Sequence, residues 1–302
     1  MSEEELTKLQ TALKSKDENT ITEITISHTT KELLTIRESY KSKFSRDLID
    51  DIEKYTKSDL CTVLTALYKD PVEYDIDLLY KAMKGIGTND EILIEVISFR
   101  PYSRLNKIKQ KFKEKYGKDL ISEVKSETSG DYKTTLVSLL EKGRNTNTSP
   151  DLENCIKIAD ELYSSGEGKI GTNEDTFIKY FTTLSAEELT TVGKEYHKKY
   201  KKNIVQVIEK EFSGDLKKLL KNILYGLISP SEYFARQING AVKGLGTNDA
   251  QLIRSIVTRK DEDMKMIKKY YKKLFGKNMA DDIKGDTGGN YQKILLALIG
   301  EN

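Results

Sequence analysis

Lys84-Gly85-Ile86-Gly87-Thr88 is a glycine turn, and related turns occur twice more in this chain of 302 residues. Each turn is followed, 40 positions after its last glycine, by an acidic residue. The three pairs are Lys84–Thr88 with Glu127, Lys169-Ile170-Gly171-Thr172 with Glu211, and Lys243-Gly244-Leu245-Gly246-Thr247 with Asp286. One interval kept three times is not expected by accident. A glycine turn that frees backbone carbonyls, together with one distant carboxylate, makes an all-oxygen site for a hard cation, which indicates calcium.

The glycine turns belong to a longer unit that occurs four times. Its clearest markers are the strings Tyr40-Lys-Ser-Lys-Phe-Ser-Arg-Asp-Leu48, Phe112-Lys-Glu-Lys-Tyr-Gly-Lys-Asp-Leu120, Tyr196-His-Lys-Lys-Tyr-Lys-Lys-Asn-Ile204 and Tyr271-Lys-Lys-Leu-Phe-Gly-Lys-Asn-Met279. Apolar residues within a unit recur at helical spacing, as at Ile94 and Ile97, and alternation typical of strands is rare. Pro71, Pro150 and Pro230 fall at junctions between units, where a helix is expected to stop.

These patterns predict an all-α protein made of four repeats, each with about five helices. The predicted boundaries are residues 1–70 for a degenerate first repeat, 71–143 for the second, 144–227 for a linker and the third, and 228–302 for the fourth.

The repeats, the Lys-Gly-x-Gly-Thr loops, the acid 40 positions later and a polar connection at 141–150 resemble the annexin family, whose members bind phospholipids in a calcium-dependent way. The resemblance covers essentially the whole chain. It implies that the four repeats form a slightly curved disc. The loops that join the first and second helices of a repeat, and the fourth and fifth, would lie on its convex face.

The resemblance also implies how each main site holds calcium, with three carbonyl oxygens from the first loop and a bidentate carboxylate from the second. Carried over residue by residue, the ligand sets are Met83, Gly85 and Gly87 with Glu127; Gly166, Lys169 and Gly171 with Glu211; and Val242, Gly244 and Gly246 with Asp286. The third loop, 166–172, is similar to the variant usual in third annexin repeats, with an extra residue ahead of the lysine.

The first repeat departs from this pattern. Its loop, Ala12–Glu18, has no glycine, and Tyr55 stands where the other repeats have an acid. We therefore expect no main calcium site in the first repeat.

The residues around the glycine turns suggest two further roles. Thr88 is predicted to cap the next helix, with Glu91 completing a capping box. Apolar residues at the tips of the loops can enter the boundary of a lipid headgroup layer, or they can fold back onto their own repeat. These tip residues are Ile86, Ile170 and Leu245. A plain turn into a helix would explain the threonine but not the acid 40 positions later.

Composition and motifs exclude several classes of function. The net charge is only +2, so nucleic acid is not an expected partner. The glycine turns lack the Gly-Lys-Ser/Thr of a nucleotide-binding loop, no EF-hand string occurs, and no catalytic constellation is visible, so no enzymatic activity is expected. The acidic start and the absence of a long apolar segment favour a cytoplasmic protein.

The leading hypothesis is therefore a cytoplasmic protein that is peripheral on anionic phospholipid membranes when calcium is raised. The alternative is an adaptor for cytoskeletal or other protein partners, with calcium secondary.

Overall fold

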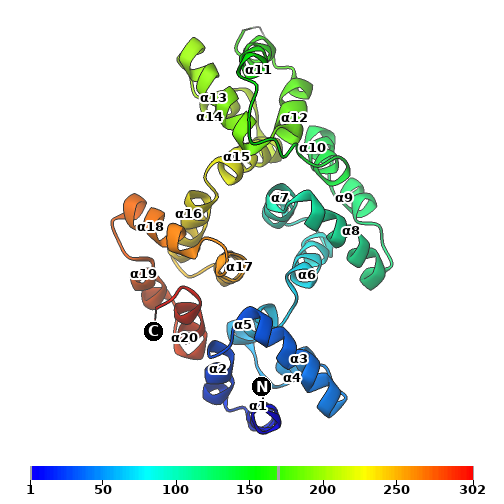
Figure 1. Ribbon diagram of the computed structural model, residues 1–302, viewed down its shortest axis with the longest axis vertical. Coiled ribbons are helices and arrows are strands. Elements are labelled where there is room, and N and C mark those ends of the chain that lie inside the picture. Colours follow the sequence, from blue (N-terminus) through cyan, green and yellow to red (C-terminus); the bar gives the residue numbers. More distant parts are fainter. Residues whose placement is uncertain (1, 169–170, 302) are drawn as a thin grey trace. The chain divides into compact units, whose positions relative to one another are not determined.

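The computed structural model describes residues 2–168 and 171–301, and the chain divides into two compact units. Unit 1 comprises residues 1–74 and 231–302, and unit 2 comprises residues 75–230. The described residues form twenty α-helices and no strand (Figure 1). The all-α prediction is therefore confirmed.

Unit 1 contains the first and the last five helices of the chain. The first five are α1 (Glu3–Ser15), α2 (Glu18–Ile26), α3 (Thr30–Phe44), α4 (Leu48–Tyr55) and α5 (Ser58–Leu67). The last five are α16 (Pro230–Val242), α17 (Asp249–Arg259), α18 (Met264–Phe275), α19 (Met279–Asp286) and α20 (Gly289–Leu298).

Unit 2 contains the ten helices between them, and α6 begins just before the boundary. The second repeat has α6 (Pro71–Met83), α7 (Asp90–Phe99), α8 (Tyr102–Tyr116), α9 (Leu120–Glu127) and α10 (Gly130–Glu141). The third has α11 (Leu152–Ser165), α12 (Glu174–Thr183), α13 (Ala186–Tyr200), α14 (Ile204–Glu211) and α15 (Gly214–Ile228).

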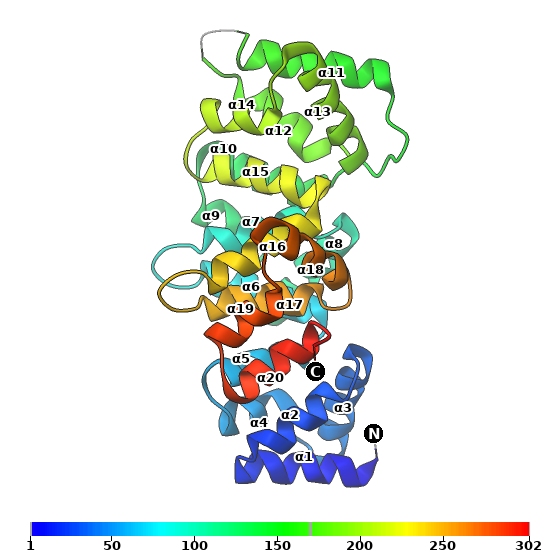
Figure 2. The same ribbon diagram turned by 90° about the vertical axis from the view of Figure 1, so that its left-hand side faces the viewer.

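Each unit is centred on the second and fifth helices of its two repeats. In unit 1, α2, α5, α17 and α20 lie side by side, and in unit 2 the same is true of α7, α10, α12 and α15 (Figures 1 and 2). Their inward faces are fully buried, as at Leu64 and Ile294 in unit 1 and Leu136 and Leu220 in unit 2. Removing this apolar surface from water is the main favourable contribution to folding.

Local sequence determines where several helices begin. Thr29 caps α3 and Ser185 caps α13, each in a capping box with a glutamate three residues later. Among the described residues, no helix is both long and apolar enough to cross a lipid bilayer.

Unit 2 buries one carboxylate completely. Asp75 of α6 is 0% exposed. Its Oδ1 lies 3.0 Å from Nη2 of Arg100, and its Oδ2 lies 2.6 Å from Nη2 of Arg104. A buried carboxylate with two guanidinium partners links α6 to α7 and α8.

Candidate metal-binding loops

The loop of the second repeat joins α6 to α7 and projects beyond both helices, as the cyan loop at the left of Figure 2. Gly85 has φ +114° and Gly87 has φ +85°, backbone angles that side chains rarely permit. The carbonyl oxygens of Met83, Gly85 and Gly87 accept no hydrogen bond from any residue that the structure describes. Three acceptors therefore remain available in one short loop.

The distant acid of this repeat lies beside its loop, as the spacing predicts. The Thr88 hydroxyl lies 3.2 Å from Oε2 of Glu127, the last residue of α9, and donates to it. A carboxylate and the three available carbonyls are therefore brought to one end of the repeat, and this is the donor set that a hard cation prefers.

Thr88 does not cap α7, so that prediction is wrong. The capping residue is Asn89, whose side chain accepts from the amide of Ile92 at 3.3 Å. The helix starts one residue later than expected, which leaves Glu91 in the wrong position for a capping box and frees the Thr88 hydroxyl for Glu127. The backbone N–H of Asn89 also donates to the carbonyl of Ala82 at 2.9 Å, which closes the base of the loop.

The fourth repeat has the same arrangement. Gly244 and Gly246 have φ values of +130° and +88°, and the carbonyls of Val242, Gly244 and Gly246 accept no hydrogen bond from described residues. Thr247 donates its hydroxyl to the carbonyl of Asp286 at 3.1 Å.

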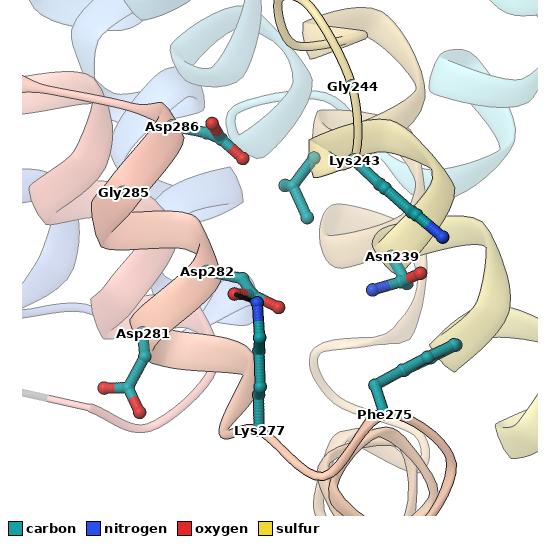
Figure 3. A pocket seen from close by; sticks show the side chains of 10 residues that line it. Asn239, Lys243, Gly244, Phe275, Lys277, Asp281, Asp282, Gly285 and Asp286 are labelled. Carbon is teal, nitrogen blue, oxygen red and sulfur yellow. Dashed lines mark hydrogen bonds and ion pairs between the residues drawn. The ribbon is translucent and has the colours of Figure 1, made fainter.

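The Asp286 carboxylate faces open space beside the fourth loop. A pocket of about 490 Å³ separates the loop from α19, and Figure 3 shows the Asp286 side chain directed across it toward Lys243 and Gly244. Asp282 also lines the pocket, where it accepts a hydrogen bond from Tyr271 at 2.7 Å and pairs with Lys277 at 3.5 Å. Asp281 lines the same pocket, so three carboxylates face it.

In the third repeat, the loop and its acid also meet. Gly171 has φ +82°, and Thr172 donates to Oε2 of Glu211 at 2.8 Å. This bond, followed by the ion pair with Lys210, lowers the pKa of Glu211 below its ordinary value. Gly166 follows α11 directly as its C-cap. The expected ligand Lys169 and the expected tip residue Ile170 lie outside the described residues.

The first repeat uses its loop carbonyls internally. Only two residues separate α1 from α2. The carbonyl of Ala12 accepts from the amide of Asp17 at 2.8 Å, that of Leu13 accepts from Lys16 at 3.1 Å, and that of Lys16 accepts from Glu18 at 3.0 Å. Tyr55, at the end of α4, supplies no carboxylate. The loop of the first repeat therefore leaves fewer carbonyls available than the loops of the second and fourth repeats.

The need for glycine in the fourth loop can be tested with a matched pair of substitutions. A Cβ added at Gly246 or at Gly240 would meet nothing within 4 Å, but only Gly246 has a positive φ. We expect Gly246→Ala to lower the free energy of unfolding by about 1–2 kcal/mol through backbone strain. Gly240→Ala, inside α16, should raise it by about 0.5–1 kcal/mol. Denaturant unfolding without calcium measures both, and equal effects would show that the loop tolerates a side chain.

Comparison with known protein families and structures agrees with this architecture. The family model described as Annexin matches residues 5–67, 74–139, 157–223 and 233–298. Human annexin A4 is 36% identical over 284 residues, which make up 94% of this chain and 89% of that protein. Annexin A7 of Dictyostelium discoideum is 39% identical over 265 residues, 87% of this chain. The chain spans only 57% of the length of that annexin A7, and also 57% of human annexin A11.

Solved structures show the same fold. Annexin III superimposes with a TM-score of 0.95 at 30% sequence identity, covering 99% of this chain and 93% of that one. Calcium-bound annexin (Sm)1 superimposes with a TM-score of 0.84 at 29% identity, covering 98% of this chain and 89% of that one.

Proposed function

Because this chain belongs to the annexin family, we propose that it binds anionic phospholipid membranes in a calcium-dependent way through the loops of its second, third and fourth repeats. The proposed calcium ligands are the carbonyls of Met83, Gly85 and Gly87 with Glu127; those of Gly166, Lys169 and Gly171 with Glu211; and those of Val242, Gly244 and Gly246 with Asp286.

The observation that supports this proposal most directly is the pairing of unbonded carbonyls with one carboxylate at the second and fourth loops. In the second loop, no described residue donates a hydrogen bond to the carbonyls of Met83, Gly85 and Gly87. Thr88 donates to the Glu127 carboxylate and so holds it beside this loop. Calcium takes six to eight oxygen ligands, so three carbonyls and a carboxylate leave positions for the phosphate oxygens of a lipid.

The tips of the same two loops are apolar. Ile86 and Leu245 are fully exposed, and each lies between the two glycines of its loop. An exposed aliphatic side chain next to a lipid-binding position gains free energy by entering the headgroup boundary. Each loop therefore combines oxygen ligands for calcium with an apolar tip for the lipid layer.

Sedimentation with vesicles tests the proposal. The protein should pellet with vesicles that contain phosphatidylserine when calcium is present, remain in the supernatant when calcium is chelated, and bind weakly to vesicles of phosphatidylcholine alone. Equal pelleting with and without calcium, or no pelleting in either case, would contradict the proposed function.

The contribution of the apolar tips can be measured separately. We expect the double variant Ile86→Ala/Leu245→Ala to bind phosphatidylserine vesicles at least about tenfold more weakly at a fixed calcium concentration, because several methylene groups no longer enter the lipid layer. Calcium binding without lipid should be unchanged.

Met266→Ala provides a control for this pair. Met266 is a large apolar side chain, 44% exposed, but it lies in α18 and not in a glycine loop. If Met266→Ala weakens vesicle binding as much as the double variant does, the tips have no special role.

A further inference from the structure

The third loop contains an ion pair that the second and fourth loops lack within the described part of the chain. Lys210 directly precedes Glu211, whereas the residues that precede Glu127 and Asp286 are Ser126 and Gly285. Of the three repeats, only the third therefore has a cationic residue directly before its proposed calcium ligand.

The ammonium group of Lys210 engages this carboxylate directly. Its Nζ lies 3.2 Å from Oε1 of Glu211, while the other oxygen of Glu211 accepts from Thr172 at 2.8 Å. Both oxygens of the carboxylate that would bind calcium are thus in use. Among the described residues, the Glu127 carboxylate of the second repeat accepts a hydrogen bond only from Thr88. The Asp286 carboxylate of the fourth repeat has no hydrogen bond or ion pair with any of them.

A second carboxylate holds Lys210 in place. Glu167 lies in the extra segment of the third loop, and its Oε1 is 3.4 Å from the Lys210 Nζ and 2.6 Å from the Nζ of Lys202. The Glu167 side chain is only 5% exposed. Its Oε2 is buried with no hydrogen-bond partner among the described residues. A buried carboxylate requires a compensating cation, so Glu167 attracts the ammonium group of Lys210 as well as that of Lys202.

Lys210 can leave Glu211 without leaving Glu167 unpaired. Lys202 remains bonded to Glu167 when Lys210 moves, and Lys210 itself is 65% exposed, so its ammonium group can turn into water.

We propose that Lys210 determines the calcium affinity of the third loop, because its ammonium group competes with calcium for the carboxylate of Glu211. This inference rests on the proposed function, since it assumes that Glu211 is a calcium ligand. It adds that the third loop carries its own competitor, whereas no described residue pairs with the carboxylate of Glu127 or Asp286 as Lys210 does with that of Glu211.

A variant in which only the third loop can bind calcium tests this proposal. Glu127→Gln/Asp286→Asn removes the carboxylates of the other two loops, and Lys210→Ser then introduces the residue type found at this position in the second repeat. Calcium is titrated without lipid, and binding is followed by the backbone amide NMR signals of Gly171 and Glu211. We expect Lys210→Ser to lower the dissociation constant by about two- to tenfold, the range expected for loss of one or two exposed ion pairs next to a cation site.

Two control variants are made in the same background. Lys210→Arg keeps the positive charge and should retain the dissociation constant of the background variant within about twofold. Lys157→Ser changes the net charge equally but removes an exposed pair with Glu153 in α11. It should therefore leave the dissociation constant measured from the Gly171 signal unchanged.

The outcomes separate this inference from the proposed function. Equal dissociation constants for the background variant and for Lys210→Ser, or an equal gain in Lys157→Ser, would overturn the role of Lys210 while leaving Glu211 as a ligand. No calcium-dependent shift in either protein would reject the third loop as a calcium site, and both statements would then fail for this repeat.

Discussion

Replacing Glu127, Glu211 and Asp286 together with alanine is expected to abolish calcium-dependent sedimentation with phosphatidylserine vesicles. These three side chains are the only carboxylates in the proposed ligand sets, and each lies at the end of a helix, outside the buried core. Neutral carbonyls alone bind a divalent cation weakly. The melting temperature measured without calcium should change by no more than about 5 °C, because surface substitutions rarely cost more than about 0.5 kcal/mol each.

A charge-matched control distinguishes loss of the sites from loss of negative charge. The control replaces three exposed glutamates that lie away from the glycine loops, namely Glu153, Glu187 and Glu262. Two of them belong to unit 2 and one to unit 1, as do the three proposed ligands. Their replacement with alanine should leave sedimentation intact. Undiminished vesicle binding by the ligand variant would refute the proposed role of the carboxylates.

Asp75→Ala is expected to lower the free energy of unfolding by about 3–5 kcal/mol. The substitution removes the buried counter-ion of Arg100, whose side chain is only 6% exposed, and it also removes a partner of Arg104. Urea unfolding followed by circular dichroism measures the loss. Asp75→Asn, which keeps one acceptor oxygen, should give an intermediate value.

An exposed ion pair in the same unit provides the comparison for Asp75. Glu209 and Lys221 approach to 2.6 Å, but both side chains are accessible to water. Glu209→Ala should therefore lower the free energy of unfolding much less than Asp75→Ala does. A similarly small loss of unfolding free energy for Asp75→Ala would mean that the buried ion pair stabilises the protein no more than an exposed one.

The helical repeats could be predicted from the sequence because their causes are local. Apolar residues at helical spacing, such as Leu219 and Ile223, mark the buried faces, and a hydroxyl residue with an acid three positions later marks the start of α3 and α13. The position of the acid beside each glycine loop was also predictable, because an interval repeated three times carries information that a single motif lacks.

The N-cap of α7, wrongly predicted to be Thr88, could not be determined from the neighbouring residues alone. Thr88 and Asn89 are both good capping residues, so the sequence near the helix does not decide between them. In the folded repeat, Thr88 donates to Glu127 at the end of α9, and Asn89 caps α7. A contact between residues 39 positions apart cannot be read from the residues around either one.

The same limit applies to Asp75 and Lys210. Asp75 lies in α6 close to Glu73 and Asp77, so nothing in the sequence distinguishes the one carboxylate that is fully buried. Lys210 is visibly adjacent to Glu211, but its second partner comes from the loop after α11. Both arrangements depend on packing between helices that are distant in the chain.

The backbone bond that closes each loop also determines which changes of loop length a repeat can accommodate. The same bond, from the amide of the capping residue to a carbonyl near the end of the preceding helix, is present at Asp17, Asn89, Asn173 and Asn248. It joins the two helices regardless of how many residues lie between them, so insertions and deletions in a loop are absorbed outside the packed core. Loss of the glycine turn in the first repeat therefore needs no repacking of α1 against α2. A loop transplanted from one repeat to another, cut at these two bonded residues, is therefore expected to fit without repacking, while a calcium site would also need the acid 40 positions later.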